Sequence, residues 1–220
     1  MGDLQQRYGV PVCETIIGMS YTNHLSKDKK FKKLIDVHEP FILSKKKDIC
    51  VYLCASIMSQ QLSTKVAEVI YQRFLGLYGG KAPKPQQIID TEHETLRGIG
   101  LSNAKALYVR NVASFALEQG LDHKVLGKMD NEEVISYLTQ IKGVGRWTVE
   151  MLLMFALGRE DVFSPDDLGL QNAMIHIYKL NRDDKKLFRE KILSISSRWS
   201  PYRTYACLHL WHWKDNPPLK

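Results

Sequence analysis

Residues 139–170 read TQIKGVGRWTVEMLLMFALGREDVFSPDDLGL, and this stretch decides the fold that we expect. Gly143 and Gly145 mark a tight turn between two helical segments, which we call the glycine turn (residues 139–145). Glycines permit a positive φ and the close approach of another backbone. The unpaired N–H groups of the following helix would point at this turn, so the two together form a seat for an anion such as a nucleic-acid phosphate. A plain helix connection with a glycine C-cap is the alternative.

Apolar residues recur at helical spacing along most of the chain, and no sustained period-two run bounded by turns predicts a strand. Helices are expected over residues 28–37, 48–62, 64–78, 85–96, 103–118, 147–157, 168–180, 185–195 and 200–213, and residues 1–27 as an irregular arm or a short helix. Asp130 and Glu133 predict a capping box for a helix that leads into the glycine turn. Ser200 and Pro201 predict the N-cap and first turn of the last helix. The expected fold class is all-α, with roughly ten helices.

The composition favours a globular protein with an anionic partner. A chain of 220 residues with 44% hydrophobic content can bury a sizeable core. The formal net charge is +7 and the sequence pI is about 9.1. This basic excess favours an anionic partner, but it does not separate DNA from RNA or anionic lipid.

The cysteines and the apolar runs indicate an intracellular protein. Cys13, Cys50, Cys54 and Cys207 form no CxxC pair, so reduced thiols are expected rather than disulfides or a zinc site. No secretory signal precedes the first helix, and the longest strongly apolar run, residues 151–157, is too short to span a bilayer. We expect a monomer without a membrane partner, located in the cytoplasm with the nucleoid in a prokaryote or in the nucleus of a eukaryote.

Two strings carry a resemblance to a known family. IKGVGRWT (residues 141–148), followed by SPDD (residues 164–167), resembles the helix-hairpin-helix plus Gly/Pro–Asp signature of the HhH-GPD base-excision DNA glycosylases, most closely the 3-methyladenine DNA glycosylase II branch. The resemblance extends over about residues 31–213. It implies one two-lobed unit, with residues 1–48 and 168–220 in one lobe and 49–167 in the other, and an active site in the cleft between them. It also implies that the partner is duplex DNA containing damaged bases.

The resemblance implies release of alkylated bases such as 3-methyladenine and 7-methylguanine. The N-glycosidic bond is reached only after the nucleotide leaves the stack, and a carboxylate then stabilises the oxocarbenium-like sugar. Asp166 and Asp167 are the candidates, and their alternative role is to cap the next helix. The family motif places the catalytic aspartate second, so we predict Asp167 for catalysis and Asp166 for the cap or for support.

Trp147 indicates the subtype of enzyme. Relatives that also cleave the strand carry a lysine here, which forms a Schiff base with the sugar, so Trp147 implies a monofunctional enzyme that leaves an abasic site. Trp147 and Trp211 match pocket aromatics whose faces attract a cationic base by about 0.5 to 2 kcal/mol, with core packing as the alternative. Met151 completes the predicted base pocket at a position where some relatives have tyrosine.

The resemblance also implies the contacts to DNA. Gly143, Gly145 and Thr148 are predicted to hold phosphate. Gln61 matches the residue that enters the hole left by the extruded base, although capping or a satisfied amide would also explain it.

A monovalent cation and an iron–sulfur cluster are the two inorganic groups that relatives carry. The predicted ligands of a Na+ or K+ ion are the carbonyls of Thr139, Ile141 and Val144, although Lys142 replaces the proline that is usual in the turn. No iron–sulfur cluster and no other cofactor are expected, because only Cys207 follows Asp167.

Two other functions remain open. One is a glycosylase of the same fold for uracil, hypoxanthine or mismatched thymine. The other is a non-catalytic DNA-binding module, against which the spacing of Asp167 from the glycine turn argues.

Overall fold

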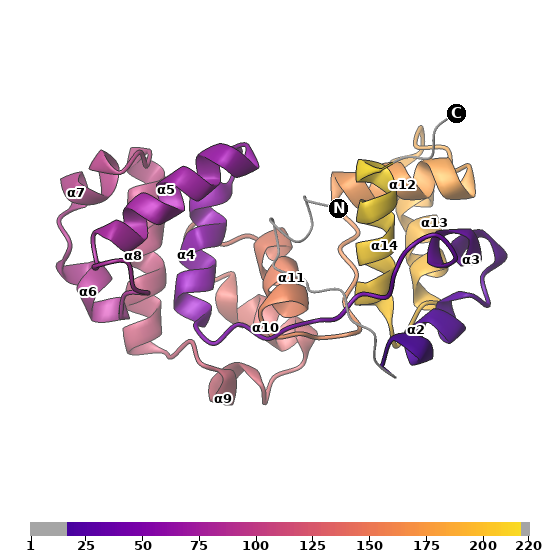
Figure 1. The fold of residues 1–220 in the computed structure, drawn as a ribbon, viewed down its shortest axis with the longest axis horizontal. Helices are drawn as coiled ribbons and strands as arrows, with labels where there is room; N and C mark the ends of the chain where they lie inside the picture. The colour runs from indigo at the N-terminus through magenta and orange to yellow at the C-terminus, as the bar shows by residue number, and fades with distance from the viewer. Residues whose placement is uncertain (1–16, 217–220) are drawn as a thin grey trace. The chain divides into compact units, whose positions relative to one another are not determined.

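A computed structural model describes residues 17–216 of the chain, and helices make up its regular structure (Figure 1). Within these residues no strand is present, and a single bridge residue, Phe41, is the nearest approach to one. The all-α prediction is confirmed. The helices divide between two compact units, and each unit is described by itself.

Unit 2 is one continuous piece, residues 45–152. It contains α4 (Ile49–Ser59), α5 (Thr64–Gly76), α6 (Pro85–Asp90), α7 (His93–Gly98), α8 (Asn103–Glu118), α9 (His123–Leu126), α10 (Asn131–Leu138) and most of α11 (Arg146–Phe155). Helix α4 lies along α8, with Leu53 and Ile57 of α4 and Val109 of α8 fully buried (Figure 1). Side-chain N-caps start α4, α5, α8, α9 and α10, and Asp130 with Glu133 forms the predicted capping box of α10.

Unit 1 joins residues 17–44 to residues 153–216. It contains α2 (Ile17–Leu25), α3 (Lys29–Ile35), α12 (Leu168–Tyr178), α13 (Lys185–Ser197) and α14 (Arg203–Asp215). Helix α14 lies against α12 and also contacts α3. Tyr21 of α2 stacks on Tyr205 of α14, with ring centroids 4.1 Å apart, and its hydroxyl accepts a hydrogen bond from the Phe41 backbone N–H. The last helix thus holds together segments from both ends of the chain.

Three histidines of unit 1, His38, His209 and His212, form a hydrogen-bonded row that we call the histidine chain. Nδ1 of His38 lies 3.2 Å from Nδ1 of His209, and Nε2 of His38 lies 2.9 Å from Nδ1 of His212. Nε2 of His209 is buried without a hydrogen-bond partner. A buried N–H donor without a partner is costly, so His209 carries its proton on Nδ1 and donates to His38, which donates to His212.

The boundaries between the units differ from the predicted ones. The second boundary lies at residues 152–153, inside α11, and not at 167–168. The reason is packing, because Phe155 at the end of α11 lies 5.9 Å from the ring of Trp211 in unit 1. Part of the predicted N-terminal arm is the helix α2, and residues 1–16 lie outside the described part.

The predicted start of the last helix is wrong. Helix α14 begins at Arg203, and Ser200 and Pro201 form a turn before it that contains a cis peptide bond. Ser200 is engaged elsewhere, since its hydroxyl donates to Asp161 at 2.8 Å. The same carboxylate accepts from the backbone N–H of Arg203, so Asp161 occupies the place of a cap.

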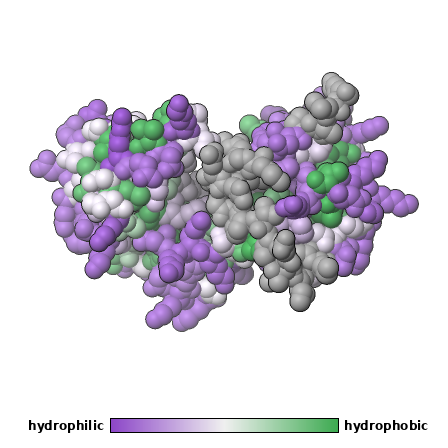
Figure 2. All heavy atoms as spheres, in the orientation of Figure 1, coloured by the Kyte–Doolittle hydropathy of each residue, from purple (hydrophilic) through white to green (hydrophobic). Residues whose placement is uncertain are grey.

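Cys50, Cys54 and Cys207 are buried, and Cys13 lies outside the described residues. No helix in the part of the chain that the structure describes has the length and apolar character needed to cross a bilayer. On the face drawn in Figure 2, hydrophilic side chains cover most of both units, and apolar ones appear in small groups.

Candidate active site

Asp167 stands at the start of α12 and is its N-cap. Its Oδ1 accepts a hydrogen bond from the backbone N–H of Leu170 at 2.8 Å. The same oxygen accepts a second bond from the indole Nε1–H of Trp211, on α14, at 3.0 Å. The predicted catalytic carboxylate is therefore held by a helix terminus and by a buried tryptophan at once.

The loop that leads to Asp167 is fixed to α14 by several bonds. The hydroxyl of Thr204 donates to the Arg159 carbonyl at 2.6 Å and accepts from the Val162 backbone N–H at 3.1 Å. Arg203 pairs with Asp161 through two nitrogens, at 2.6 and 3.0 Å. Although burial acts to raise it, the pKa of Asp161 is lowered because Arg203 hydrogen-bonds the carboxylate. These bonds give the loop a defined path into α12.

Asp166 does not cap α12, so that part of the prediction is wrong. Its exposed carboxylate forms an ion pair with Arg189 of α13. Asp167 takes the cap itself because its position directly before Leu168 directs its side chain at the first turn.

The three residues of the predicted base pocket differ in exposure. Trp147 is 40% exposed on α11, whereas Met151 is buried and Trp211 is only 6% exposed. The hydroxyl of Tyr52, on α4, donates to the backbone carbonyl of Met151 at 3.3 Å, and sequence analysis did not single out this aromatic. Among the three, Trp147 presents the largest share of its surface to solvent.

The two glycines of the glycine turn are in different surroundings. Gly143 has a φ of +105°, and a Cβ there would lie 2.3 Å from Cγ of Tyr108. Gly145 has open space, because a Cβ there would meet no atom within 4 Å. Packing against Tyr108 explains Gly143, whereas no contact within unit 2 explains Gly145.

Thr148 and Gln61 complete the predicted DNA contacts. Thr148 is 4% exposed, so a contact from the first turn of α11 would come from its backbone N–H and not from its hydroxyl. Gln61 follows α4 in an exposed turn and has a φ of +58°, a left-handed conformation that costs a non-glycine residue energy. Such strain at an exposed glutamine agrees with a side chain held out for contact.

The carbonyls predicted to bind a cation are of the right chemical type, since Na+ and K+ take oxygen ligands. The Ile141 carbonyl already accepts the Val144 backbone N–H at 2.9 Å, so it would offer a cation its second lone pair. The Lys142 carbonyl accepts from the Asn111 side chain at 3.2 Å, which braces the turn without the usual proline. The carbonyls are thus chemically suited to a monovalent cation, and its binding stays a prediction.

Sequence analysis missed an ion-pair cluster at the glycine turn. Arg146, the first residue of α11, donates from Nε to Glu150 at 3.0 Å and from both terminal nitrogens to Glu132 of α10. These hydrogen bonds lower the pKa of Glu132, and Glu150 is only 2% exposed. The cluster ties together the two helices that flank the turn.

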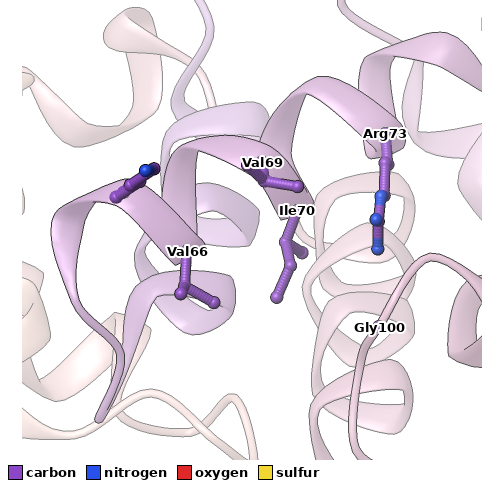
Figure 3. A pocket seen from close by; sticks show the side chains of 6 residues that line it. Val66, Val69, Ile70, Arg73 and Gly100 are labelled. Carbon is purple, nitrogen blue, oxygen red and sulfur yellow. The ribbon is translucent and has the colours of Figure 1, made fainter.

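A shallow groove of about 420 Å³ lies elsewhere on unit 2 (Figure 3). Val66, Val69 and Ile70 of α5 form its apolar side, and Gly100 lies on the facing loop. Lys65 and Arg73 also line it, and none of the predicted site residues does.

The structure thus assembles two groups of site residues, each within its own unit. Asp167 and Trp211 belong to unit 1, and the glycine turn, Trp147 and Gln61 belong to unit 2. The predicted cleft between the lobes stays a prediction.

Comparison with known proteins gives one family. The model of the "HhH-GPD superfamily base excision DNA repair protein" matches residues 54–198. DNA-3-methyladenine glycosylase 1 of Schizosaccharomyces pombe is 36% identical over 185 residues, which are 83% of this chain and 80% of that protein.

Two solved structures are similar over nearly the whole chain. The S. pombe 3-methyladenine DNA glycosylase in complex with abasic DNA has a TM-score of 0.78 at 32% identity, over 91% of this chain and 98% of that one. A DNA-3-methyladenine glycosidase from Bacillus halodurans has a TM-score of 0.79 at 33% identity, over 94% of this chain and 93% of that one.

Proposed function

Because this chain belongs to the HhH-GPD superfamily of base excision DNA repair proteins, we propose that it is a monofunctional DNA glycosylase for alkylated bases in duplex DNA. Its substrates would include 3-methyladenine and 7-methylguanine. The observation that carries the proposal is Asp167, a carboxylate held at a helix start by the Leu170 N–H and the Trp211 indole.

Hydrolysis breaks the C1′–N bond, whose electron pair leaves with the base, and forms a C1′–O bond to water. Positive charge grows on the sugar before water adds. The carboxylate of Asp167 would stabilise this charge and would accept a proton of the attacking water. A cationic alkylated base leaves as a neutral molecule, so an aspartate without a strong general acid suffices.

The glycine turn would hold the DNA without reading its sequence. The first turn of α11 offers backbone N–H groups, and the open space at Gly145 allows a phosphate to approach them. A Na+ or K+ ion on the carbonyls of Thr139, Ile141 and Val144 would add positive charge beside that phosphate. Gln61 would fill the space left by the extruded base, and the exposed face of Trp147 would favour a cationic base.

Trp147 also bears on the type of reaction. An indole has no amine to attack the sugar, so no Schiff base can form at this position. We therefore predict that borohydride traps no covalent complex between the protein and alkylated DNA. A trapped species that survives denaturation would reveal a lyase activity from another residue.

The test of the proposed function is release of 3-methyladenine by the Asp167→Asn variant. Asparagine keeps an Oδ1 acceptor for Leu170 and Trp211, so the fold should persist, while base release should fall by about a hundredfold or more. Duplex binding should survive or tighten. Asp166→Asn is the matched control, because that aspartate pairs with Arg189 at the surface, and it should release base normally. Near-normal release by Asp167→Asn would remove Asp167 from the mechanism.

A panel of lesions in the same assay tests the alternatives. Release of uracil, hypoxanthine or mismatched thymine in preference to alkylated bases would change the substrate class. Duplex binding without release of any base would indicate a DNA-binding module. The proposed setting is a monomer at the nucleoid or in the nucleus.

A further inference from the structure

Trp211 and Gly169 both lie next to Oδ1 of Asp167. The indole Nε1–H of Trp211 and the backbone N–H of Leu170 both donate a hydrogen bond to Oδ1, at 3.0 and 2.8 Å. Fixing Oδ1 by two donors also fixes the plane of the carboxylate, and with it the direction of Oδ2. The two donors come from different helices, because Trp211 lies 44 residues after Asp167.

Gly169 provides the space for this contact. A Cβ at Gly169 would lie 3.1 Å from Oδ1 of Asp167, 3.2 Å from Cδ1 of Trp211 and 3.3 Å from its Nε1. All three distances are tighter than ordinary contact. Gly169 is the second residue of α12, and any larger residue there would have to displace the carboxylate or the indole.

We propose that Trp211 is a positioning residue that orients the catalytic carboxylate through its indole N–H, and that Gly169 is the small residue this arrangement requires. The proposal rests on the proposed function, in which Asp167 is the catalytic group. A carboxylate must face the sugar in one direction when charge develops, and a preorganised orientation avoids reorganisation at that moment. Trp211 suits this role because it is 6% exposed and packs against Phe155.

The Trp211→Phe variant distinguishes the role of the indole N–H from the role of the aromatic ring. Phenylalanine keeps an aromatic ring and removes the donor, so kcat should fall about tenfold or more while KM and duplex affinity stay unchanged. Asp167 serves every substrate, and the loss should therefore be equal for cationic 3-methyladenine and neutral hypoxanthine. A loss confined to the cationic base, or an unchanged kcat, would overturn the proposal.

Gly169→Ala tests the same arrangement from the other side. The methyl group should displace the carboxylate or the indole by a few tenths of an ångström and lower kcat, whereas the melting temperature should change little, because both neighbours keep their hydrogen bonds and packing after so small a shift. A merely structural role predicts that stability and kcat fall together. Gly76→Ala is the matched control, since Gly76 is also helical and a Cβ there meets nothing within 4 Å, so its kcat should not change. A normal kcat in Gly169→Ala would contradict the role of Gly169.

An NMR measurement tests the hydrogen bond between Trp211 and Asp167 independently of catalysis. The indole ¹H–¹⁵N signal of Trp211 is identified as the one that Trp211→Phe lacks. It should move upfield in Asp167→Asn, where a neutral amide replaces the carboxylate, and should stay in place in Asp166→Asn. An indole signal that Asp167→Asn leaves in place would overturn the proposal. If the parent protein released no base, the proposed function would fail, whereas this signal would still decide whether the bond exists.

Discussion

At the scale of single residues, glycine stands at two positions of the turn, 143 and 145, for different physical reasons. Gly143 has a positive φ and lies against Tyr108, so the turn needs glycine there for its own structure. At Gly145 a side chain would enter open space. The sequence predicted both glycines as phosphate contacts. The structure gives a conformational reason for glycine at position 143, so only at position 145 does the phosphate contact remain the reason that we propose for glycine.

Gly145→Asp should weaken binding to all duplexes alike, because it puts a side chain and a negative charge where we propose that a phosphate approaches the backbone. The protein should keep its melting temperature, since the added Cβ meets no atom. Duplex affinity measured at matched salt, for damaged and undamaged DNA, checks this. The control is Gly76→Ala, which should bind as the parent does. Normal binding by Gly145→Asp would place the phosphate elsewhere.

At the scale of elements, the hairpin of α10 and α11 is fastened by Arg146. A cation at the first position of a helix opposes the helix dipole, by about 0.3 to 1 kcal/mol. Two carboxylates offset this cost, one from each helix, and the buried one is Glu150. The hairpin geometry therefore depends on an ion-pair cluster as well as on its glycines.

Glu150→Gln should lower the free energy of unfolding by about 1 to 2 kcal/mol, because glutamine keeps an acceptor for Arg146 but removes the buried charge that strengthens the hydrogen bond. Chemical denaturation measures this value. Glu94→Gln is the matched control, since Glu94 pairs with Arg97 at the surface of α7 at 3.0 Å, and it should change stability by less than about 1 kcal/mol. Equal effects of the two variants would mean that the Arg146 cluster does not fasten the hairpin.

What the sequence could predict at this scale depends on the distance along the chain. The capping box of Asp130 and Glu133 spans three residues, and local spacing predicted it correctly. Ser200 looked like a cap, but its partner is Asp161, 39 residues away, and local pattern cannot reveal such a bond. The link from Trp211 to Asp167 is equally remote, so the sequence suggested both residues for the site without the hydrogen bond between them.

At the scale of the whole molecule, stability should depend on pH through the histidine chain. Burial lowers the pKa of His38 to about 4, holds that of His209 well below its ordinary value and also lowers that of His212. Tyr21 lies beside His209, and Asp215 partly opposes the shift of His212. The folded chain needs neutral rings, because each N···N contact uses one donor and one acceptor.

The folded pKa of His38 lies below the unfolded value of 6.5, so the unfolded state binds more protons between these values. Stability is therefore fully present above about pH 6.5 and should fall as the pH drops towards about 4. Melting temperature against pH measures this. His38→Gln should be less stable at pH 7.5 but should show a shallower decline, and His176→Gln, at an exposed histidine, should keep the parental slope. A parental melting temperature that stays flat over this window would contradict the prediction.

The way the chain is divided between the two units determines which unit can fold first during synthesis. Residues 45–152 are contiguous, so this unit can complete its core as soon as it leaves the ribosome, whereas the other must wait for α14 to join residues 17–44. The loop to Asp167 also waits, because Thr204 and Trp211 arrive with the last helix. We expect a chain that ends near residue 170 and has been released from the ribosome to protect the glycine turn from protease but not the Asp167 loop. The capacity to hold DNA would then precede the capacity to release a base from it, and an unfinished chain would occupy a lesion without repairing it.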